Sequence, residues 1–145
     1  DALPIFGWMA NWLDVKDHPE TSWTCQMTVP RVLGLARYHG ELVLTQQPIC
    51  ETTYEIFEEI PQSGVIELSG FAKVGYNVDR KVIFINDFEA PYEPTSGKIH
   101  LKVLVDKSSI ELFTADGVRT ISLSLFPPLG TTRELVPGSL VDIVS

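Results

Sequence analysis

Short runs of alternating apolar and polar residues follow one another along most of this 145-residue chain. The clearest run is Lys98–Asp106, where every second residue is apolar; the residues on that face are Ile99, Leu101, Val103 and Val105. A period of two residues is typical of a strand with one buried face. Ser108–Thr114 repeats the pattern after a short connection, so the two runs predict a β-hairpin. In its second strand Ile110 and Leu112 face inward, and the polar residues between them are Ser109 and Glu111.

The same alternation predicts further strands on both sides of this hairpin. They are expected at Gly64–Ser69, Phe71–Gly75, Lys81–Asn86, Val118–Phe126 and Leu140–Val144. Ala115–Gly117 is expected to form a turn because Asp-Gly tolerates positive φ, and Pro127-Pro128 is expected to end strand pairing. Short strands at this spacing predict a β-sandwich or barrel. Glu51–Ile60 stays open, because its aromatic spacing suits a helix whereas its β-branched residues favour a strand.

The first third of the chain predicts a separate small sheet. Residues 1–45 contain all three Trp and both Met. Strand-like pieces lie at Ile5–Trp12, Thr24–Val29, Arg31–Arg37 and Glu41–Thr45, with a tight turn at His39-Gly40 and a polar loop over Leu13–Ser22. Such a set resembles one blade of a β-propeller, and a blade buries its two flat faces against neighbouring blades. No internal repeat supplies those neighbours, so we expect a partner surface to cover this sheet.

Charge and cysteine content exclude several classes of protein. Nineteen acidic and eleven basic residues give a net charge of −8, which argues against binding nucleic acid or an anionic membrane, since both need a basic face. No apolar run approaches the ~18 residues of a membrane span. Cys25 and Cys50 are too few for a four-thiolate zinc site or a disulfide-rich scaffold; one bridge or two mostly buried free thiols both fit.

The chain begins with Asp1 rather than Met and shows no signal peptide, so we expect part of a longer protein or a processed product. No catalytic template is complete: the G-x-S-x-G elbow and the glycine-rich phosphate loops are absent. His100 alternates outward and is expected on the surface. The loop residues Asp14, Asp17, His18 and Glu20 match no metal-ligand spacing.

Asp87 and Glu89 form an acidic patch, which we expect in a solvated turn. Glycoside hydrolysis needs two carboxyl groups about 5–9.5 Å apart in a cleft, and the sequence does not place these two in one. Trp8 and Trp12 fall on one face of an extended segment, with Asn11 between them. An aromatic face can stack on a sugar ring, but the pattern alone favours both Trp in the core of a sheet.

Gly7–Trp12, with the sequence Gly-Trp-Met-Ala-Asn-Trp, resembles the G-W-M-x-N-W segment of glycoside hydrolase family 32, the family of invertases, inulinases and levanases. Further segments resemble family motifs in the same order. Met27–Arg31 resembles M-[ST]-[LV]-P-R-E, although Val32 stands where the family usually has Glu. Leu42–Pro48 resembles the strand that ends the catalytic domain, and Val105–Phe113 resembles V-D-[RK]-S-S-[VI]-E-[VL]-F.

The resemblance implies an all-β chain. Residues 1–48 would be the last part of a five-bladed β-propeller, 49–61 a linker, and 62–145 an antiparallel β-sandwich. The parent would be a retaining β-fructofuranosidase that hydrolyses terminal fructosyl bonds of sucrose or fructans. The family's N-D-P-N-G, R-D-P and E-C motifs, which carry its catalytic carboxylates, do not occur here. We therefore expect no catalytic residue in this chain and no activity from it alone.

Trp12 matches the second Trp of the family motif, which lines the fructosyl pocket, so the resemblance implies that Trp12 binds substrate. Trp8 is expected to be structural. The implied partners are the N-terminal propeller portion of the same enzyme and a sucrose or fructan substrate, with no metal and no cofactor; a homo-oligomer through the sandwich is a further option. The alternatives are a non-catalytic carbohydrate-binding or oligomerisation module and an unrelated lectin-like protein. The acidic composition favours an extracellular location, although cytosolic relatives exist.

Overall fold

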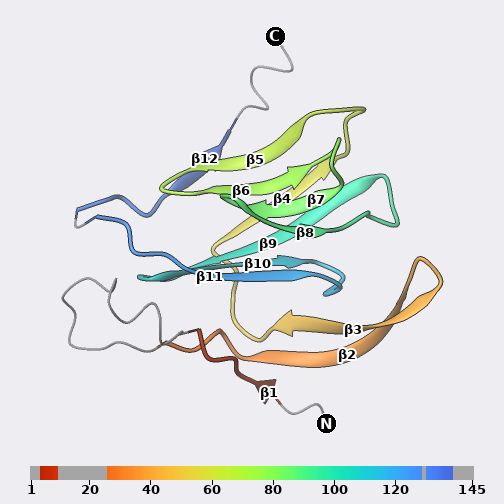
Figure 1. The fold of residues 1–145 in the computed structure, drawn as a ribbon, viewed down its shortest axis with the longest axis horizontal. Helices are drawn as coiled ribbons and strands as arrows, with labels where there is room; N and C mark the ends of the chain where they lie inside the picture. The colour runs from red at the N-terminus through yellow and green to blue at the C-terminus, as the bar shows by residue number, and fades with distance from the viewer. Residues whose placement is uncertain (1–3, 10–25, 129, 139–145) are drawn as a thin grey trace.

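The computed structural model describes residues 4–9, 26–128 and 130–138, and these ranges contain strands but no helix (Figure 1). The predicted all-β fold with an antiparallel sandwich is confirmed. The strands are β1 (Pro4–Ile5), β2 (Arg31–Tyr38), β3 (Glu41–Pro48), β4 (Tyr54–Glu59), β5 (Val65–Gly70), β6 (Lys73–Asn77), β7 (Val82–Ile85), β8 (Phe88–Pro91), β9 (Lys98–Val105), β10 (Ser109–Thr114), β11 (Thr120–Ser124) and β12 (Leu135–Pro137).

The strands form three antiparallel sheets that lie in layers. The N-terminal sheet has the order β1-β2-β3, the middle sheet β11-β10-β9-β4, and the distal sheet β12-β5-β6-β7-β8. Figure 1 shows the N-terminal sheet at one end of the molecule, the distal sheet at the other, and β9–β11 between them. No helix in the described ranges is long and apolar enough to cross a membrane.

The hydrophobic core lies between the middle and distal sheets. Alternating apolar side chains of both sheets point into this space and are almost completely inaccessible; they include Ile66, Val74, Ile83, Ile85, Ile99, Leu101, Val103, Ile110 and Leu112. The period-two pattern therefore identified the inward face of β9, except that Val105 is only partly buried. Burial of these side chains is the main force that holds the two sheets together.

The predicted hairpin is present, but its second strand is buried on both faces. β9 and β10 pair antiparallel, with Val105 opposite Ile110. All six residues of β10 are buried, including Ser109 at 9% exposure and Glu111 at 2%. The prediction from alternation that this strand has one exposed face is therefore wrong for β10. The reason is that the segment leading into β2 covers the outer face of the middle sheet, as the hydrogen bond from Val29 N–H to Glu111 illustrates.

Three other expectations have clear outcomes. The segment Glu51–Ile60, open between helix and strand, contains β4, which pairs with β9 and lies within the range expected to be a linker. The extended segment expected at Ile5–Trp12 is a strand only at Pro4–Ile5 in the described residues, followed by an isolated bridge between Trp8 and Met27. The strand expected at Leu140–Val144 lies outside the described residues.

Two predicted turns have the backbone geometry that their residues favour. His39 and Gly40 have φ values of 47° and 85° and join β2 to β3. Gly117 has a φ of 77° in the turn between β10 and β11. A side chain at Gly117 would also collide with β3, since an added Cβ would lie 2.9 Å from the carbonyl oxygen of Gln46. The turn after β10 thus approaches the N-terminal sheet closely.

Candidate functional site

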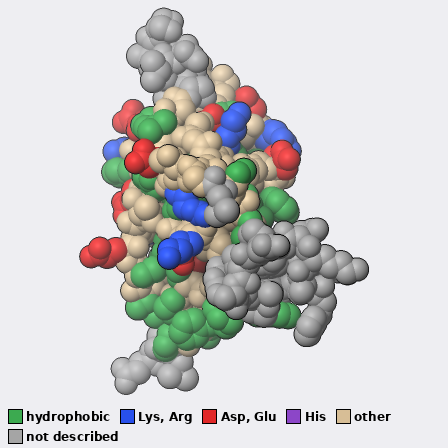
Figure 2. All heavy atoms as spheres, turned by 90° about the vertical axis from the view of Figure 1, so that its left-hand side faces the viewer, with side chains coloured by type: hydrophobic (Ala, Val, Ile, Leu, Met, Phe, Trp, Pro, Cys, Tyr) green, Lys and Arg blue, Asp and Glu red, His purple; other side chains and the backbone are tan. Residues whose placement is uncertain are grey.

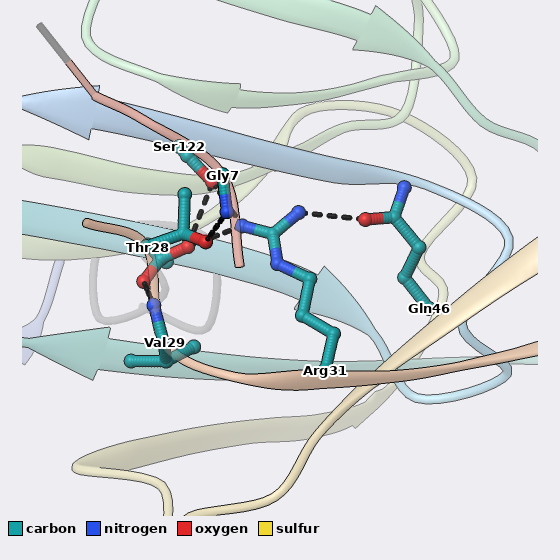
Figure 3. Close-up of polar contacts among 7 residues, drawn as sticks. Gly7, Thr28, Val29, Arg31, Gln46 and Ser122 are labelled. Atoms are coloured by element: carbon teal, nitrogen blue, oxygen red, sulfur yellow. Dashed lines mark hydrogen bonds and ion pairs between the residues drawn. The ribbon is translucent and has the colours of Figure 1, made fainter. Parts of the chain in front are cut away.

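The segments that carry the sequence motifs meet where the N-terminal sheet contacts the middle sheet. Next to β1, residues 7–9 pair with residues 26–28: Thr28 N–H donates to the Gly7 carbonyl at 2.8 Å and Met9 N–H to the Gln26 carbonyl at 2.9 Å. Gly7 N–H in turn donates to Thr28 Oγ1 at 2.8 Å (Figure 3). This short ladder joins the segment that leads to Trp12 to the segment that begins β2.

A buried ion pair links the N-terminal sheet to the middle sheet. Arg31, the first residue of β2, donates from Nη2 to Glu111 Oε1 on β10. Their side chains are 9% and 2% exposed. Removing two charges from water is costly, so such a pair is stable only when its remaining hydrogen-bonding groups are also satisfied.

Neighbouring groups satisfy most of this requirement. Glu111 also accepts hydrogen bonds from Val29 N–H at 2.8 Å and from Ser122 Oγ at 2.8 Å. Figure 3 shows the Arg31 guanidinium reaching toward Ser122 on one side and Gln46 on the other; Nη2 donates to Ser122 Oγ at 2.6 Å and Nη1 to Gln46 Oε1 at 2.6 Å. The bonding capacity of the carboxylate is largely used in these contacts, so Glu111 anchors the N-terminal sheet to the middle sheet.

The Arg31 guanidinium also lies over an aromatic ring. Its Cζ is 5.0 Å from the ring centroid of Phe113, which is fully buried on β10. Nε of Arg31 has no hydrogen-bond partner among the described residues. A cation over a desolvated ring gains electrostatic stabilisation, which offsets part of the cost of burying that charge.

Two further contacts fix the N-terminal sheet along its length. The Gln26 amide bridges β11 and the residue just before β10: its Nε2 donates to Ser124 Oγ at 2.7 Å and to the Ser108 carbonyl at 3.0 Å. At the opposite end, the Tyr38 ring at the end of β2 stacks on Tyr92 with centroids 5.9 Å apart. The N-terminal sheet and the segment leading into it are therefore held by polar contacts at Gln26 and Arg31 and by an aromatic contact at Tyr38.

Tyr38 and Val43 pack against the core, and the positions that alternate with them in β2 and β3 present exposed apolar side chains. Leu35 of β2 lies directly opposite Leu44 of β3, and these side chains are 69% and 54% exposed. Other large apolar side chains exposed on this part of the chain are Phe6, Trp8, Met27, Leu42 and Ile49. Figure 2 shows hydrophobic side chains gathered at the lower end of the molecule, where the N-terminal sheet lies. Apolar patches of this kind usually mark contact surfaces.

The structure locates only some of the candidates from the sequence. Trp12, Cys25 and the loop acids lie outside the described residues. Trp8 is 51% exposed beside its bridge partner Met27. Cys50 is exposed, so its expected burial is wrong; the segment after β3 leaves the sheet edge at that point. Partial desolvation raises the pKa of the Cys50 thiol, and the nearby negative charge of Glu111 raises this pKa further.

His100 lies on the outer surface of β9, as alternation predicts. Its Nε2 is 3.1 Å from Oε2 of Glu55 on β4, and this hydrogen bond lowers the pKa of that carboxyl group. No group of three His, Cys, Asp or Glu residues in the described ranges could hold a metal ion. On the surface around His100 the structure thus shows an exposed contact between an imidazole and a carboxyl group.

Asp87 is exposed in the turn between β7 and β8, as expected, whereas Glu89 lies within β8 and its side chain pairs with Arg80, so the expected turn position is wrong for Glu89. They also line an open hollow of about 450 Å³ on the distal sheet, which the sequence did not indicate. The Arg31–Glu111 anchor was missed as well. Its only signal in the sequence is Glu111, a charged residue between the apolar residues Ile110 and Leu112. The period-two pattern predicts that such a position faces solvent.

Comparison with known proteins places this arrangement in a family. A model for the C-terminal part of glycosyl hydrolases family 32 matches residues 51–137. A levanase of Bacillus subtilis (strain 168) is 26% identical over 83% of this chain and 26% of its own length, and a levanase of Bacillus sp. (strain L7) is 28% identical over 85% and 19%. The chain thus spans about a quarter or less of these curated relatives.

A solved structure shows the same fold. The exo-inulinase of Aspergillus awamori superposes with a TM-score of 0.71 at 19% sequence identity, and the match covers 91% of this chain and 38% of that chain. The superposition includes most of the described strands of both the N-terminal sheet and the sandwich, since it covers nine-tenths of the chain.

Proposed function

This chain belongs to glycosyl hydrolase family 32, with the family's C-terminal domain over residues 51–137, and from this membership we propose that it works as the C-terminal portion of a fructosidase. The whole enzyme would hydrolyse terminal β-fructosyl bonds of sucrose or a fructan with retention, through a carboxylate nucleophile and a carboxylic acid/base on the remaining propeller. Residues 1–48 would form the end of that propeller and the two sheets beyond them the sandwich.

The exposed apolar side of the N-terminal sheet is the observation that carries this proposal. Leu35 and Leu44 form a cross-strand pair that projects away from the sandwich. Burying one such side chain contributes roughly 1.5–3 kcal/mol, so a neighbouring blade stacked on this surface would gain considerable free energy. The match covers 26% and 19% of the two levanases, so the rest of each relative is long enough to contain such a blade.

The role of the described residues in this proposal is positioning. Trp12 would stack on the fructosyl ring, and the ladder between residues 7–9 and 26–28 holds the chain on both sides of the segment that contains it. The Arg31–Glu111 pair fixes that ladder to β10. The reacting carboxylates would come from the propeller portion, consistent with the absence of the family's catalytic motifs from this sequence.

Activity and mass measurements test the proposal. The purified 145-residue chain should release no fructose from sucrose, inulin or levan, whereas native material that contains the propeller portion should release it. Intact-mass analysis of the native material should show that portion, either as a longer polypeptide or as an associated chain. Robust turnover by the 145-residue chain alone would overturn the proposal.

Variants of the native enzyme test the role of Trp12. Trp12→Ala should raise KM for sucrose by about five- to thirtyfold, because stacking and burial of an aromatic ring contribute ~1–2 kcal/mol. Trp8→Ala is the matched control and should change KM less than threefold. Equal effects of the two substitutions would show that Trp12 has no special part in substrate binding.

A further inference from the structure

The outer face of the distal sheet has a concave surface that no part of the proposed fructosidase function uses. Register places Glu67, Gly75, Phe84 and Glu89 in one row across β5, β6, β7 and β8. These residues alternate with the core residues Ile66, Val74, Tyr76, Ile83 and Ile85, so the row faces away from the middle sheet. It also faces away from the N-terminal sheet, which lies at the opposite end of the molecule (Figure 1).

Gly75 leaves this row without a side chain on β6. A Cβ added there would lie 1.9 Å from the carbonyl oxygen of Ile66, so the two strands approach too closely for any side chain. Three residues of the row, Glu67, Phe84 and Glu89, line an open hollow of about 450 Å³. Its other lining residues are Val65, Asn77, Arg80, Asn86 and Asp87. We call this space the distal hollow. Its size is within the range of small-molecule sites in proteins.

Local contacts orient the polar side chains of the distal hollow. Arg80 Nη2 lies 2.5 Å from Glu89 Oε2, which fixes the guanidinium beside the carboxylate. Asn77 Oδ1 accepts from Arg80 N–H at 3.0 Å, and Asn86 Oδ1 accepts from Lys73 N–H at 2.9 Å. Because the oxygen of each amide is engaged by the backbone, each NH₂ group remains available as a donor.

The chemistry of the lining selects one ligand class. Glu67, Asp87 and Glu89 outnumber Arg80, so the distal hollow repels anions. The described residues contain no group of acids that could hold a metal ion. What remains is a set of planar carboxylate, guanidinium and amide groups, which pair well with neighbouring hydroxyl groups. Phe84, only 9% exposed, adds an apolar floor suited to the C–H face of a sugar ring.

We propose that the distal hollow binds a neutral carbohydrate and accommodates one or two sugar units of a fructan chain. The choice of a fructan rests on the proposed function, whereas the choice of a neutral sugar rests on the lining residues alone. Binding here leaves the N-terminal sheet untouched, so the sandwich would hold the polymer at a surface of its own.

Nuclear magnetic resonance of the 145-residue chain provides the test. Inulin-type and levan-type oligosaccharides should shift the side-chain amide signals of Asn77 and Asn86, and maltooligosaccharides should not. Asp87→Ala should weaken the affinity about tenfold, because a hydrogen bond to a charged group contributes ~1.5–3 kcal/mol. Glu58→Ala removes the same charge from an exposed position on β4 and should change the affinity less than twofold.

Asn86→Asp is a second variant that preserves the fold. Its carboxylate can still accept from Lys73 N–H, and Asp tolerates the positive φ of this turn position, but the NH₂ donor is lost. It should weaken fructan binding at least threefold. Absence of any shift at Asn77 and Asn86, binding that Asp87→Ala leaves unchanged, or binding of maltooligosaccharides alone would overturn the inference. Fructose release by the native enzyme is measured separately, so failure of this site leaves the proposed function standing.

Discussion

Replacing Glu111 by Gln tests whether the buried ion pair holds the N-terminal sheet against the sandwich. Gln keeps the size of the side chain but turns one acceptor oxygen into a donor. Oε2 accepts from Val29 N–H and Oε1 accepts from Arg31, so whichever oxygen becomes the NH₂ group, one of these two contacts is lost. The guanidinium then remains buried without its counter-charge, because the Arg31 side chain is only 9% exposed.

The expected cost is large for a single substitution. Removing one partner of a buried pair typically costs 3–5 kcal/mol, whereas an exposed pair contributes about 0–1 kcal/mol. We expect Glu111→Gln to lower the free energy of unfolding by about 3 kcal/mol, which lowers the urea midpoint by about 1–2 M. Glu93→Gln is the matched control, because it breaks the exposed pair with Lys81 and should leave the urea midpoint almost unchanged.

Two spectroscopic signals distinguish local from global loss. All three Trp lie in residues 8–23, so tryptophan fluorescence reports on the N-terminal region, whereas far-ultraviolet circular dichroism reports mainly on the sandwich strands. In Glu111→Gln the fluorescence transition should occur at lower urea than the dichroism transition, because the sheet detaches before the core opens.

A double-mutant cycle completes the test. Arg31→Met combined with Glu111→Gln should cost less than the sum of the single substitutions by ~1–3 kcal/mol, because no unpaired charge stays buried. Additive costs, or a Glu111→Gln variant as stable as the Glu93→Gln control, would refute the anchoring argument.

Other predictions follow from the same structure. Burial, and then the hydrogen bond to Asp116, raise the pKa of Tyr92, so the unfolded chain loses this proton first. Unfolding free energy should therefore be retained below about pH 10 and fall as pH rises further, and Tyr92→Phe should flatten that fall in urea titrations between about pH 8 and pH 11. Gly75→Ala should lower stability by about 3 kcal/mol or more, since its Cβ would overlap a carbonyl oxygen of β5; an unchanged Tm would contradict this. Leu35→Ser with Leu44→Ser should change the stability of the isolated chain by less than about 1 kcal/mol, yet weaken its association with the propeller portion at least tenfold in co-purification.

Local pattern predicts the strands whose neighbours are close in sequence. The hairpin of β9 and β10 follows from two period-two runs and a short connection, and both strands occur as expected. The turn at His39 and Gly40 follows from residue types that tolerate positive φ. These features depend on interactions within about twenty residues, so the local sequence pattern is sufficient to predict them.

Features that depend on distant segments could not be predicted in this way. Glu111 has the spacing of a surface residue, and only the approach of Arg31, eighty positions earlier, makes its position interior. β4 has mixed spacing, and its pairing with β9 determines that it is a strand. The distal hollow is lined by residues of β5, β6, β7, β8 and the turns between them, and only the folded sheet brings these residues together.

The segments that resemble family motifs gain a physical meaning from these contacts. Met27–Arg31 and Val105–Phe113 have a structural role, because Arg31 of the first segment pairs with Glu111 of the second where two sheets meet. Gln26, next to the first segment, also bonds to Ser108 in the second. A ring that stacks on a sugar must be held within about half an ångström to be effective. In the proposed enzyme the sandwich would hold the substrate-binding segment in position. Its strand β10 fixes residues 7–9 and 26–28, which flank the part of the sequence that contains Trp12.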